Sequence, residues 1–274
     1  MNIAIIGCGY IGMELAKRLK KEGHHVTATT RKPERVEELA RVAQHVVLLR
    51  GSPEEELATL LHDNDTLIVT VGADDRQDYE DTYLNLARAI KRLAQQLALP
   101  RRLLYTSSTS VYGDHHGRWV DEAAPLLSTW DQAKILIETE NTYLSLTDLG
   151  WHVLILRLAE IYGPGRELSH KIRRYAGNSL PGNGDSYTNL IHKHDAVSAL
   201  DYALRHKLTG LYNVADDDHP TRRELYDHLA VLHRSKRVVW DPTHPNLHSG
   251  NKRVSNHKLK SEGFSFHHPH HIYD

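Results

Sequence analysis

Three glycines close to the start of the chain form the first group that could do chemistry. Gly7, Gly9 and Gly12 stand in the stretch Gly7-Cys8-Gly9-Tyr10-Ile11-Gly12, between a strand-like apolar run and a helix-like stretch. In such a setting the first glycine permits a tight turn, the second lets the backbone approach a pyrophosphate, and the third lets the helix pack closely. The helix N-terminus then stabilises negative charge. The motif predicts a dinucleotide-binding loop; the alternative is a glycine-rich turn without a ligand.

Two basic residues follow the second predicted strand. Chains that bind NAD usually carry an acidic residue about 20 positions after the glycine loop, where it holds the ribose 2′-hydroxyl. Here the stretch reads Thr29-Thr30-Arg31-Lys32-Pro33, without an acid. Arginine offers a planar fork and lysine a point charge to a phosphate. We therefore predict NADP(H) rather than NAD(H); the alternative is that Arg31 and Lys32 are surface charges beside a helix.

The elements that must position these residues follow from hydrophobic periodicity. Apolar runs of strand length alternate with amphipathic stretches of helix length, which is typical of a parallel sheet covered by helices on both faces. Strands are predicted at Asn2–Ile6, His25–Thr29, His45–Leu49, Thr66–Thr70, Arg102–Thr106, His152–Arg157 and near Gly210–Val214. A first helix follows Ile11 and stops at Gly23, and another is predicted from about Tyr79 to Leu97, before Pro100.

We predict an α/β chain with a Rossmann-type, doubly wound parallel sheet and a small C-terminal substrate lobe. The dinucleotide-binding domain is expected over residues 1–163, with residues 189–215 returning to it. The lobe is expected over residues 164–274, where glycine and proline punctuate the pattern. Ligands of such sheets bind at the carboxyl ends of the strands, so the functional residues are expected there.

Composition narrows the class of protein. Among 274 residues, 34 Lys and Arg balance 35 Asp and Glu, which disfavours nucleic acid or an anionic membrane as a partner recognised through bulk charge. No apolar run approaches the ~20 residues of a membrane span. The single cysteine, Cys8, cannot form an internal disulfide, and we interpret it as a small loop residue. We therefore expect a cytoplasmic protein.

Four further stretches carry a family resemblance: Leu104–Gly113, Leu156–Arg166, Asn189–Asp195 and Leu211–Ala215. They are similar to the serine-V-Y-G, R-x-x-x-I-Y-G-P-G-R, N-x-I-H-x-x-D and Y-N-V-A/G motifs of the short-chain dehydrogenase/reductase superfamily, in its NAD-dependent epimerase/dehydratase branch. The form of the glycine loop and the short second lobe resemble the atypical subgroup. The resemblance implies an NAD(P)-binding Rossmann fold and, by analogy, a homodimer formed through two helices.

The resemblance also implies a catalytic arrangement. In active members a Tyr-x-x-x-Lys helix supplies a tyrosine that exchanges a proton with the substrate and a lysine that holds the nicotinamide ribose, while a serine hydrogen-bonds the same substrate oxygen. The matching stretch here reads Trp130-Asp131-Gln132-Ala133-Lys134, and Ser108 matches the serine. Lysine is kept, but the Trp130 indole only donates a hydrogen bond and does not titrate in the useful range. Substitute acids could be Tyr112, Tyr143, Tyr162, His115 or His116, for which packing and surface-loop roles are the alternatives.

Residues on the expected ligand path can be divided into two sets. The expected cofactor contacts are Gly7, Gly9, Tyr10, Ile11, Gly12, Arg31, Lys32, Gly72 and Lys134. The expected substrate contacts are Tyr112, Glu160, Arg166 and His192. Glu160 falls where nucleotide-sugar epimerases of the family carry an asparagine that faces phosphates, and a carboxylate there would repel a diphosphate. For His192 and Asp195 a structural role is the alternative, in which Asp195 caps a helix.

Histidine is unusually frequent in this chain. It occurs 21 times, and four copies stand in His267-His268-Pro269-His270-His271. Neutral imidazoles bind transition metals, but a functional metal site takes its ligands from an ordered framework. Proline and the nearby terminus indicate a flexible surface segment, so we predict no required metal.

Two functions remain open at this point. The first is an NADP(H)-binding oxidoreductase or epimerase-like enzyme that acts on a small carbonyl or sugar-like substrate. The second is a protein that binds NADP(H) without turnover and reports redox state to a partner. Retention of Ser108 and Lys134 favours the first, and the replacement of tyrosine by Trp130 favours the second.

Overall fold

The computed structural model of the chain describes residues 1–50, 54–73, 75–96, 101–244 and 250–273. The chain divides into two compact units, each built from three stretches. The first comprises Met1–Ser107, Asp131–Leu156 and Val197–Leu211, and the second comprises Ser108–Trp130, Arg157–Ala196 and Tyr212–Asp274. The predicted first domain comprised residues 1–163 and 189–215, whereas residues 108–130, 157–163, 189–196 and 212–215 belong to the second unit.

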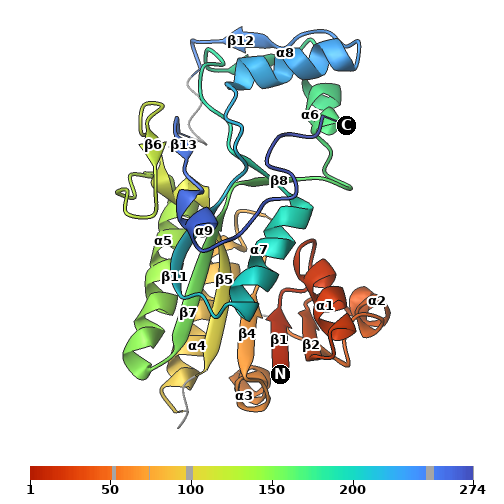
Figure 1. Cartoon of the computed structure of the whole chain (residues 1–274), viewed down its shortest axis with the longest axis vertical. Helices are drawn as coiled ribbons and strands as arrows, with labels where there is room; N and C mark the ends of the chain where they lie inside the picture. The colour runs from red at the N-terminus through yellow and green to blue at the C-terminus, as the bar shows by residue number, and fades with distance from the viewer. Residues whose placement is uncertain (51–53, 74, 97–100, 245–249, 274) are drawn as a thin grey trace. The chain divides into compact units, whose positions relative to one another are not determined.

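A seven-stranded sheet has the order β11-β7-β5-β4-β1-β2-β3 (Figure 1). Its strands are β1 (Asn2–Ile6), β2 (His25–Thr30), β3 (His45–Leu48), β4 (Thr66–Val69), β5 (Arg102–Ser108), β7 (His152–Leu158) and β11 (Gly210–Val214). Strands β3, β2, β1, β4 and β5 pair in parallel. The Rossmann-type sheet is therefore confirmed, and each predicted strand is recovered with ends shifted by at most two residues.

Helices cover both faces of this sheet, as the continuous burial of Ile3–Ile6 along β1 requires. They are α1 (Gly12–Lys21), α2 (Val36–Ala40), α3 (Glu54–Asp63), α4 (Leu86–Ala94), α5 (Asp131–Leu144) and α7 (Lys193–Arg205). Ala4 and Ile6 face a core shared with α3, α4 and α5, whereas Ile5 faces the opposite side, against α1. On that side Arg18 of α1 donates to Ser198 of α7. The predicted helix from Tyr79 is α4 preceded by a π-helix (Asp81–Asn85); Leu97 and Pro100 lie outside the described residues.

The second unit is built around small sheets and three helices (Figure 1). The sheets pair β6 (Trp119–Val120) with β13 (Arg253–Val254), β8 (Glu160–Tyr162) with β10 (Leu190–His192), and β9 (Ser179–Pro181) with β12 (Val239–Asp241). The helices are α6 (Leu168–Tyr175), α8 (Arg222–Leu232) and α9 (His257–Ser261). Leu168 and Ile172 of α6 pack with Leu225 and Leu229 of α8 in one buried cluster.

Three buried polar side chains connect the three stretches of the second unit. Tyr112 comes from the first stretch, Arg157 from the second and Asn213 from the third. The Tyr112 hydroxyl donates to Oδ1 of Asn213 (2.7 Å) and accepts from Nη1 of Arg157 (2.9 Å). At most 3% of any of the three residues is exposed. Buried polar groups are costly unless they are paired, so this trio holds the stretches in register.

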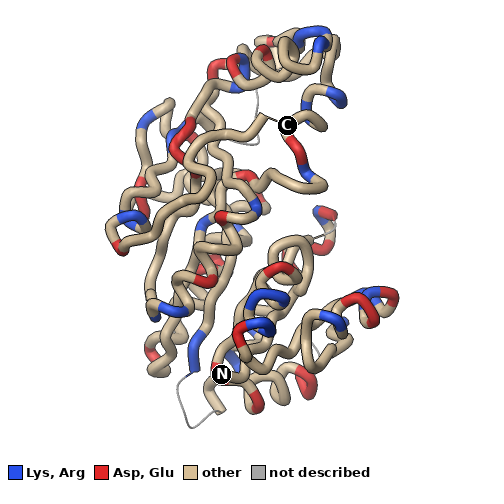
Figure 2. Tube along the Cα trace, turned by 45° about the vertical axis from the view of Figure 1, so that its right-hand side comes forward, with Lys and Arg blue, Asp and Glu red and all other residues tan. Residues whose placement is uncertain are grey.

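Charged residues of both signs occur throughout the described chain. Basic and acidic residues are interspersed along the described chain rather than gathered into one basic face (Figure 2). Within the described residues, every helix is too short or too polar to traverse a bilayer.

Replacing Tyr112 with phenylalanine tests the buried trio. Removing the hydroxyl leaves Arg157 and Asn213 without one buried partner each, so we expect the free energy of unfolding to fall by about 1–3 kcal/mol. Chemical denaturation measures the change. The matched control is Tyr175→Phe, because the Tyr175 ring is half-buried on α6 and makes ring contacts with Arg174 and Tyr226. That variant should change stability by less than about 0.5 kcal/mol; equal losses in both variants would contradict the role given to the trio.

Candidate functional site

The peptide of Gly7 is held from two sides where β1 ends. Its N–H donates to Oγ1 of Thr29 (3.0 Å), and its carbonyl accepts from Oγ1 of Thr70 (2.9 Å). Gly7 has a φ of +84°, and a Cβ there would lie 2.7 Å from Cα of Val71. Both the left-handed backbone and this contact exclude a side chain, so the fold itself requires glycine.

Gly12 brings α1 against the same loop. A Cβ on Gly12 would lie 2.6 Å from Oγ1 of Thr70 and 3.0 Å from the carbonyl oxygen of Gly7. Ile11 precedes the helix, and no described side chain caps that end. The N-terminus of α1 therefore presents backbone N–H groups and the positive end of the helix dipole beside the loop.

Gly9 and Gly72 differ from these two glycines, because no described part of the protein requires them. The nearest described atom to a Cβ on Gly9 would be the carbonyl oxygen of Gly7, at 3.9 Å, and no described atom lies within 4 Å of a Cβ on Gly72. Neither has a positive φ. A ligand that approaches the backbone closely explains both positions. The loop, with half-buried Tyr10 and buried Ile11, thus fits the pyrophosphate of a dinucleotide.

Basic side chains stand at the end of β2. Arg31 and Lys32 are exposed residues. The Arg31 guanidinium donates to Oγ1 of Thr82 (3.2 Å) and lies 3.7 Å from a carboxylate oxygen of Asp78. Because both groups of this ion pair are well exposed, the pair is worth about 0–1 kcal/mol and can be exchanged for a stronger anion.

Arg35 is a third basic residue at the loop, which sequence reasoning missed. Its Nη1 donates to the carbonyl of Cys8 at 2.9 Å. The turn that begins at Pro33 directs Arg35 back toward the loop, and proline at a helix start is the sequence signal that could have indicated it. Burial raises the pKa of the Cys8 thiol to about 12 despite this neighbouring cation, so the thiol stays protonated and unreactive at neutral pH.

The residues expected to perform catalysis are divided between the units. Ser108 ends β5, and its Oγ accepts the N–H of Ser110 (3.1 Å), so the hydroxyl hydrogen can point elsewhere. Trp130 is half-buried and directly precedes α5 rather than lying within it. Lys134 is on α5 with 59% of its side chain exposed, and its Nζ donates to Oδ1 of Asp131 (3.2 Å).

The tyrosines considered as substitute acids are buried. Tyr143 packs against Tyr105 inside the core of the first unit, where burial raises its pKa, and this excludes it as an acid that reaches a substrate. Burial also raises the pKa of Tyr112, against the opposing effect of Arg157. The hydroxyl of Tyr162, another buried residue, accepts the backbone N–H of Ile272 (3.2 Å).

The two histidines after V-Y-G lie in different environments. His116 is exposed, as expected of a surface loop. For His115 that interpretation is wrong, because the side chain is buried and its Nε2 lies 3.1 Å from the carbonyl oxygens of both Tyr112 and Pro125. Carbonyls only accept, so Nε2 donates to them and His115 serves to fix the loop.

Three of the four residues expected to contact substrate lie on or beside β8 and β10, whereas Tyr112 belongs to the buried trio. Glu160 is exposed on β8 and forms an ion pair with Lys171. Arg166 is exposed in the turn that follows β8. His192 ends β10, and its ring meets the ring of Tyr162 edge-on with centroids 5.3 Å apart.

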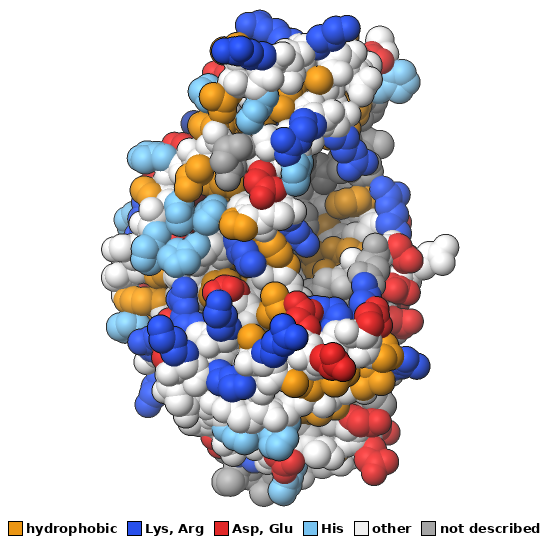
Figure 3. All heavy atoms as spheres, turned by 90° about the vertical axis from the view of Figure 1, so that its right-hand side faces the viewer, with side chains coloured by type: hydrophobic (Ala, Val, Ile, Leu, Met, Phe, Trp, Pro, Cys, Tyr) orange, Lys and Arg blue, Asp and Glu red, His pale blue; other side chains and the backbone are white. Residues whose placement is uncertain are grey.

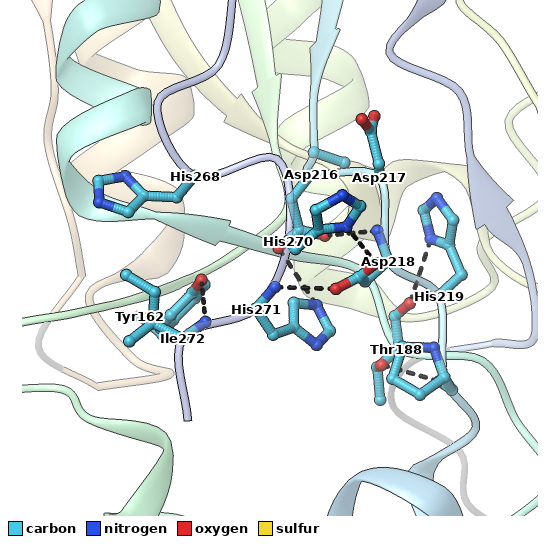
Figure 4. Close-up of polar contacts among 12 residues, drawn as sticks. Tyr162, Thr188, Asp216, Asp217, Asp218, His219, His268, His270, His271 and Ile272 are labelled. Atoms are coloured by element: carbon cyan, nitrogen blue, oxygen red, sulfur yellow. Dashed lines mark hydrogen bonds and ion pairs between the residues drawn. The ribbon is translucent and has the colours of Figure 1, made fainter. Parts of the chain in front are cut away.

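The prediction that His267–His271 form a flexible surface segment is wrong. The backbone N–H groups of His267 and His268 donate to the carboxylate of Asp195, at 2.6 and 2.9 Å. The N–H of His271 donates to Asp218 at 2.8 Å (Figure 4). Asp195 is fully buried within the first turn of α7, so it is not the cap of that helix, and its carboxylate binds this C-terminal segment (residues 267–273).

Side-chain pairs complete the attachment of the C-terminal segment. Nε2 of His271 lies 3.2 Å from a carboxylate oxygen of Asp216, with both side chains fully buried. Burial raises the pKa of Asp216 to about 6, although His271 opposes the shift. His270 pairs with Asp218 at 2.9 Å. Buried carboxylates are stable only with partners, which is the physical reason that the segment is ordered.

Comparison with known proteins places these features in a family. The NAD dependent epimerase/dehydratase family matches residues 3–215. Protein YeeZ of Escherichia coli K12 is 34% identical over 237 residues, which cover 84% of this chain and 83% of YeeZ.

Solved structures share the fold. A functionally unknown conserved protein from Silicibacter pomeroyi has a TM-score of 0.78 at 25% identity, covering 98% of this chain and 94% of that one. The UDP-glucose 4-epimerase of Thermus thermophilus, solved with NAD, has a TM-score of 0.77 at 19% identity, covering 97% and 94%. The family model matches most of the chain, and the glycine loop and the sheet order agree with that match. This chain therefore belongs to the NAD-dependent epimerase/dehydratase family.

Proposed function

We propose that this chain binds NADP(H) through the loop Gly7–Gly12 and the basic residues that follow β2. The observation that carries the proposal is the lack of any close contact at Gly9, where a Cβ would lie no nearer than 3.9 Å to a described atom, so that the fold does not require glycine but a pyrophosphate does. Arg31 and Lys32 stand where an acid would favour NAD, and their charge favours a 2′-phosphate. Arg35 adds a further positive charge beside the loop.

We further propose an oxidoreductase or epimerase-like activity on a small carbonyl or sugar-like substrate. The cofactor, when bound, supplies hydride transfer. Ser108 donates a hydrogen bond to the substrate oxygen, and Lys134 exchanges its weak ion pair with Asp131 for the nicotinamide ribose. Arg166, Glu160 and His192 contact the substrate, and Tyr112 acts by holding the framework around them. Trp130 cannot move a proton, so solvent water supplies it.

A second function is favoured by one observation. Tyr112 and Tyr143 are fully buried and Trp130 replaces the tyrosine of the motif, so no tyrosine takes over the proton transfer at these three positions. In that case the chain binds NADP(H) without turnover and reports the redox state of the cofactor to a partner.

Gly9→Ala tests cofactor binding separately from folding. The new methyl group would make only an ordinary contact with the carbonyl oxygen of Gly7, at 3.9 Å, so stability should change by less than about 0.5 kcal/mol. The methyl group would stand in the place given to the pyrophosphate, so NADPH affinity measured by calorimetry should fall by about tenfold or more. Gly7→Ala is the contrast, because it should lose stability as well. Unchanged NADPH affinity in the Gly9 variant would refute the proposed loop function.

The double variant Arg31→Gln/Lys32→Gln tests the choice of cofactor. Hydrogen bonds to charged groups contribute about 1.5–3 kcal/mol, so NADPH affinity should fall by about 10- to 100-fold while NADH affinity stays nearly constant. Lys21→Gln, an exposed change at the end of α1, serves as the control and should leave both affinities unchanged. Tighter binding of NADH than of NADPH by the parent protein would overturn the NADP(H) assignment.

Trp130→Tyr distinguishes the two functions. NADPH oxidation is followed with a panel of small aldehydes, ketones and keto sugars. If the parent protein is an enzyme, it turns over slowly, and restoring an acid should raise the rate by about 100-fold or more. Trp130→Phe, which adds no acid, should not. If only the Trp130→Tyr variant turns over, the parent is the protein that binds NADP(H) without turnover. If neither the parent nor this variant turns over, the roles given to Ser108 and Lys134 are refuted.

A further inference from the structure

Two segments that are far apart in the sequence meet at Asp195. His192, His194 and Asp195 stand where β10 runs into α7, and His267 and His268 begin the C-terminal segment. Histidine side chains also gather visibly on one part of the molecular surface (Figure 3). Four imidazoles thus surround one fully buried carboxylate within the second unit.

The two oxygens of Asp195 have different surroundings. Oδ2 accepts the N–H of His268 (2.9 Å) and lies 2.8 Å from Nδ1 of the same residue, so it is engaged in a short hydrogen bond with the ring. Oδ1 accepts the N–H of His267 (2.6 Å) and lies 3.5 Å from Nδ1 of His267. The rings of His194 and His267 lie nearly perpendicular, with centroids 4.5 Å apart and an interplanar angle of 84°.

We propose that His194, Asp195 and His267 bind one divalent transition-metal ion of the zinc type. One ligand atom of each residue lies within 4.8 Å of the others. Bonds of 2.0–2.1 Å in tetrahedral geometry separate ligand atoms by about 3.3–3.4 Å, which is close to the 3.5 Å between Oδ1 of Asp195 and Nδ1 of His267. Two imidazoles and a carboxylate suit zinc, and water completes the coordination.

His268 is a positioning residue in this site. A second group, His192, Asp195 and His268, also brings three ligand atoms within 4.8 Å, but there the Asp195–His268 contact is already a hydrogen bond of 2.8 Å. By holding Oδ2, His268 leaves Oδ1 directed to the metal and fixes the orientation of the carboxylate. His267 is 61% exposed, which gives an ion and its water molecules access to the site from solvent.

The ion would join the start of α7 to the C-terminal segment. The ion would link side chains of both segments, in addition to the hydrogen bonds that Asp195 already accepts. It would bind independently of NADP(H). Its effect would be to hold these two segments together, so metal binding can be measured without an assay of activity.

The test is calorimetric titration of the tag-free, EDTA-treated full chain with Zn²⁺ at neutral pH. We expect one tight ion per chain. His267→Gln should weaken it by about tenfold or more, since a direct ligand is lost, and so should His194→Gln; the exposed His267 makes its variant the one that folds with least risk. The matched control is His62→Gln, an exposed histidine 2.8 Å from Asp63, which should bind Zn²⁺ as the parent does.

Two further measurements separate a metal site from ordinary histidine–aspartate pairs. His268→Gln should weaken Zn²⁺ binding by about 10- to 100-fold, as expected of a residue that orients a ligand. Co²⁺ bound to the parent should show the strong visible bands of tetrahedral coordination, and His267→Gln should lose them. Absence of a tight site, equal loss in the His62 control, or loss only in His192→Gln and His268→Gln would each overturn the assignment.

Discussion

The Gly7 peptide is held by both neighbours of β1, and the ligand-binding part of the first unit depends on that arrangement. Thr29 on β2 accepts its N–H, Thr70 after β4 donates to its carbonyl, and the backbone of Val71 leaves no room for a side chain. β1 lies between β2 and β4 in the sheet, where the connections depart in opposite directions. Because this peptide is fixed, the start of α1 and the end of β2 both lie next to the glycine loop.

Much of the fold could be predicted from the sequence, because parallel strands are buried on both faces and read as continuous apolar runs. The glycine loop was also predictable, because the roles of its glycines depend on residues that are close in the sequence. The C-terminal segment was not, because its order depends on Asp195, Asp216 and Asp218, which only the folded chain brings to it. Arg35 was missed and His115 was misjudged for one reason, because the partners of both side chains are backbone carbonyls, which sequence patterns do not mark.

Burial and pairing decide the chemistry of the candidate residues more than residue type does. Tyr112 looked like an acid by its place in V-Y-G, but a phenol that both donates and accepts inside a dry core is a structural connector. Lys134 has the opposite character, since its exposed pair with Asp131 holds it only weakly and leaves it available to a ligand. Residue type suggested that both Tyr112 and Lys134 act in the site, and their different burial separates the structural residue from the one that can bind a ligand.

The second unit is completed by residues at the far end of the chain. Nζ of Lys252 donates to the carbonyl of Gly113, 139 positions earlier, and β13 pairs with β6 across a comparable interval. During synthesis on the ribosome, the stretch Ser108–Trp130 therefore emerges long before its partners exist. Until those later residues are synthesised, its polar groups and apolar side chains lack their partners, and the segment is one that chaperones can recognise.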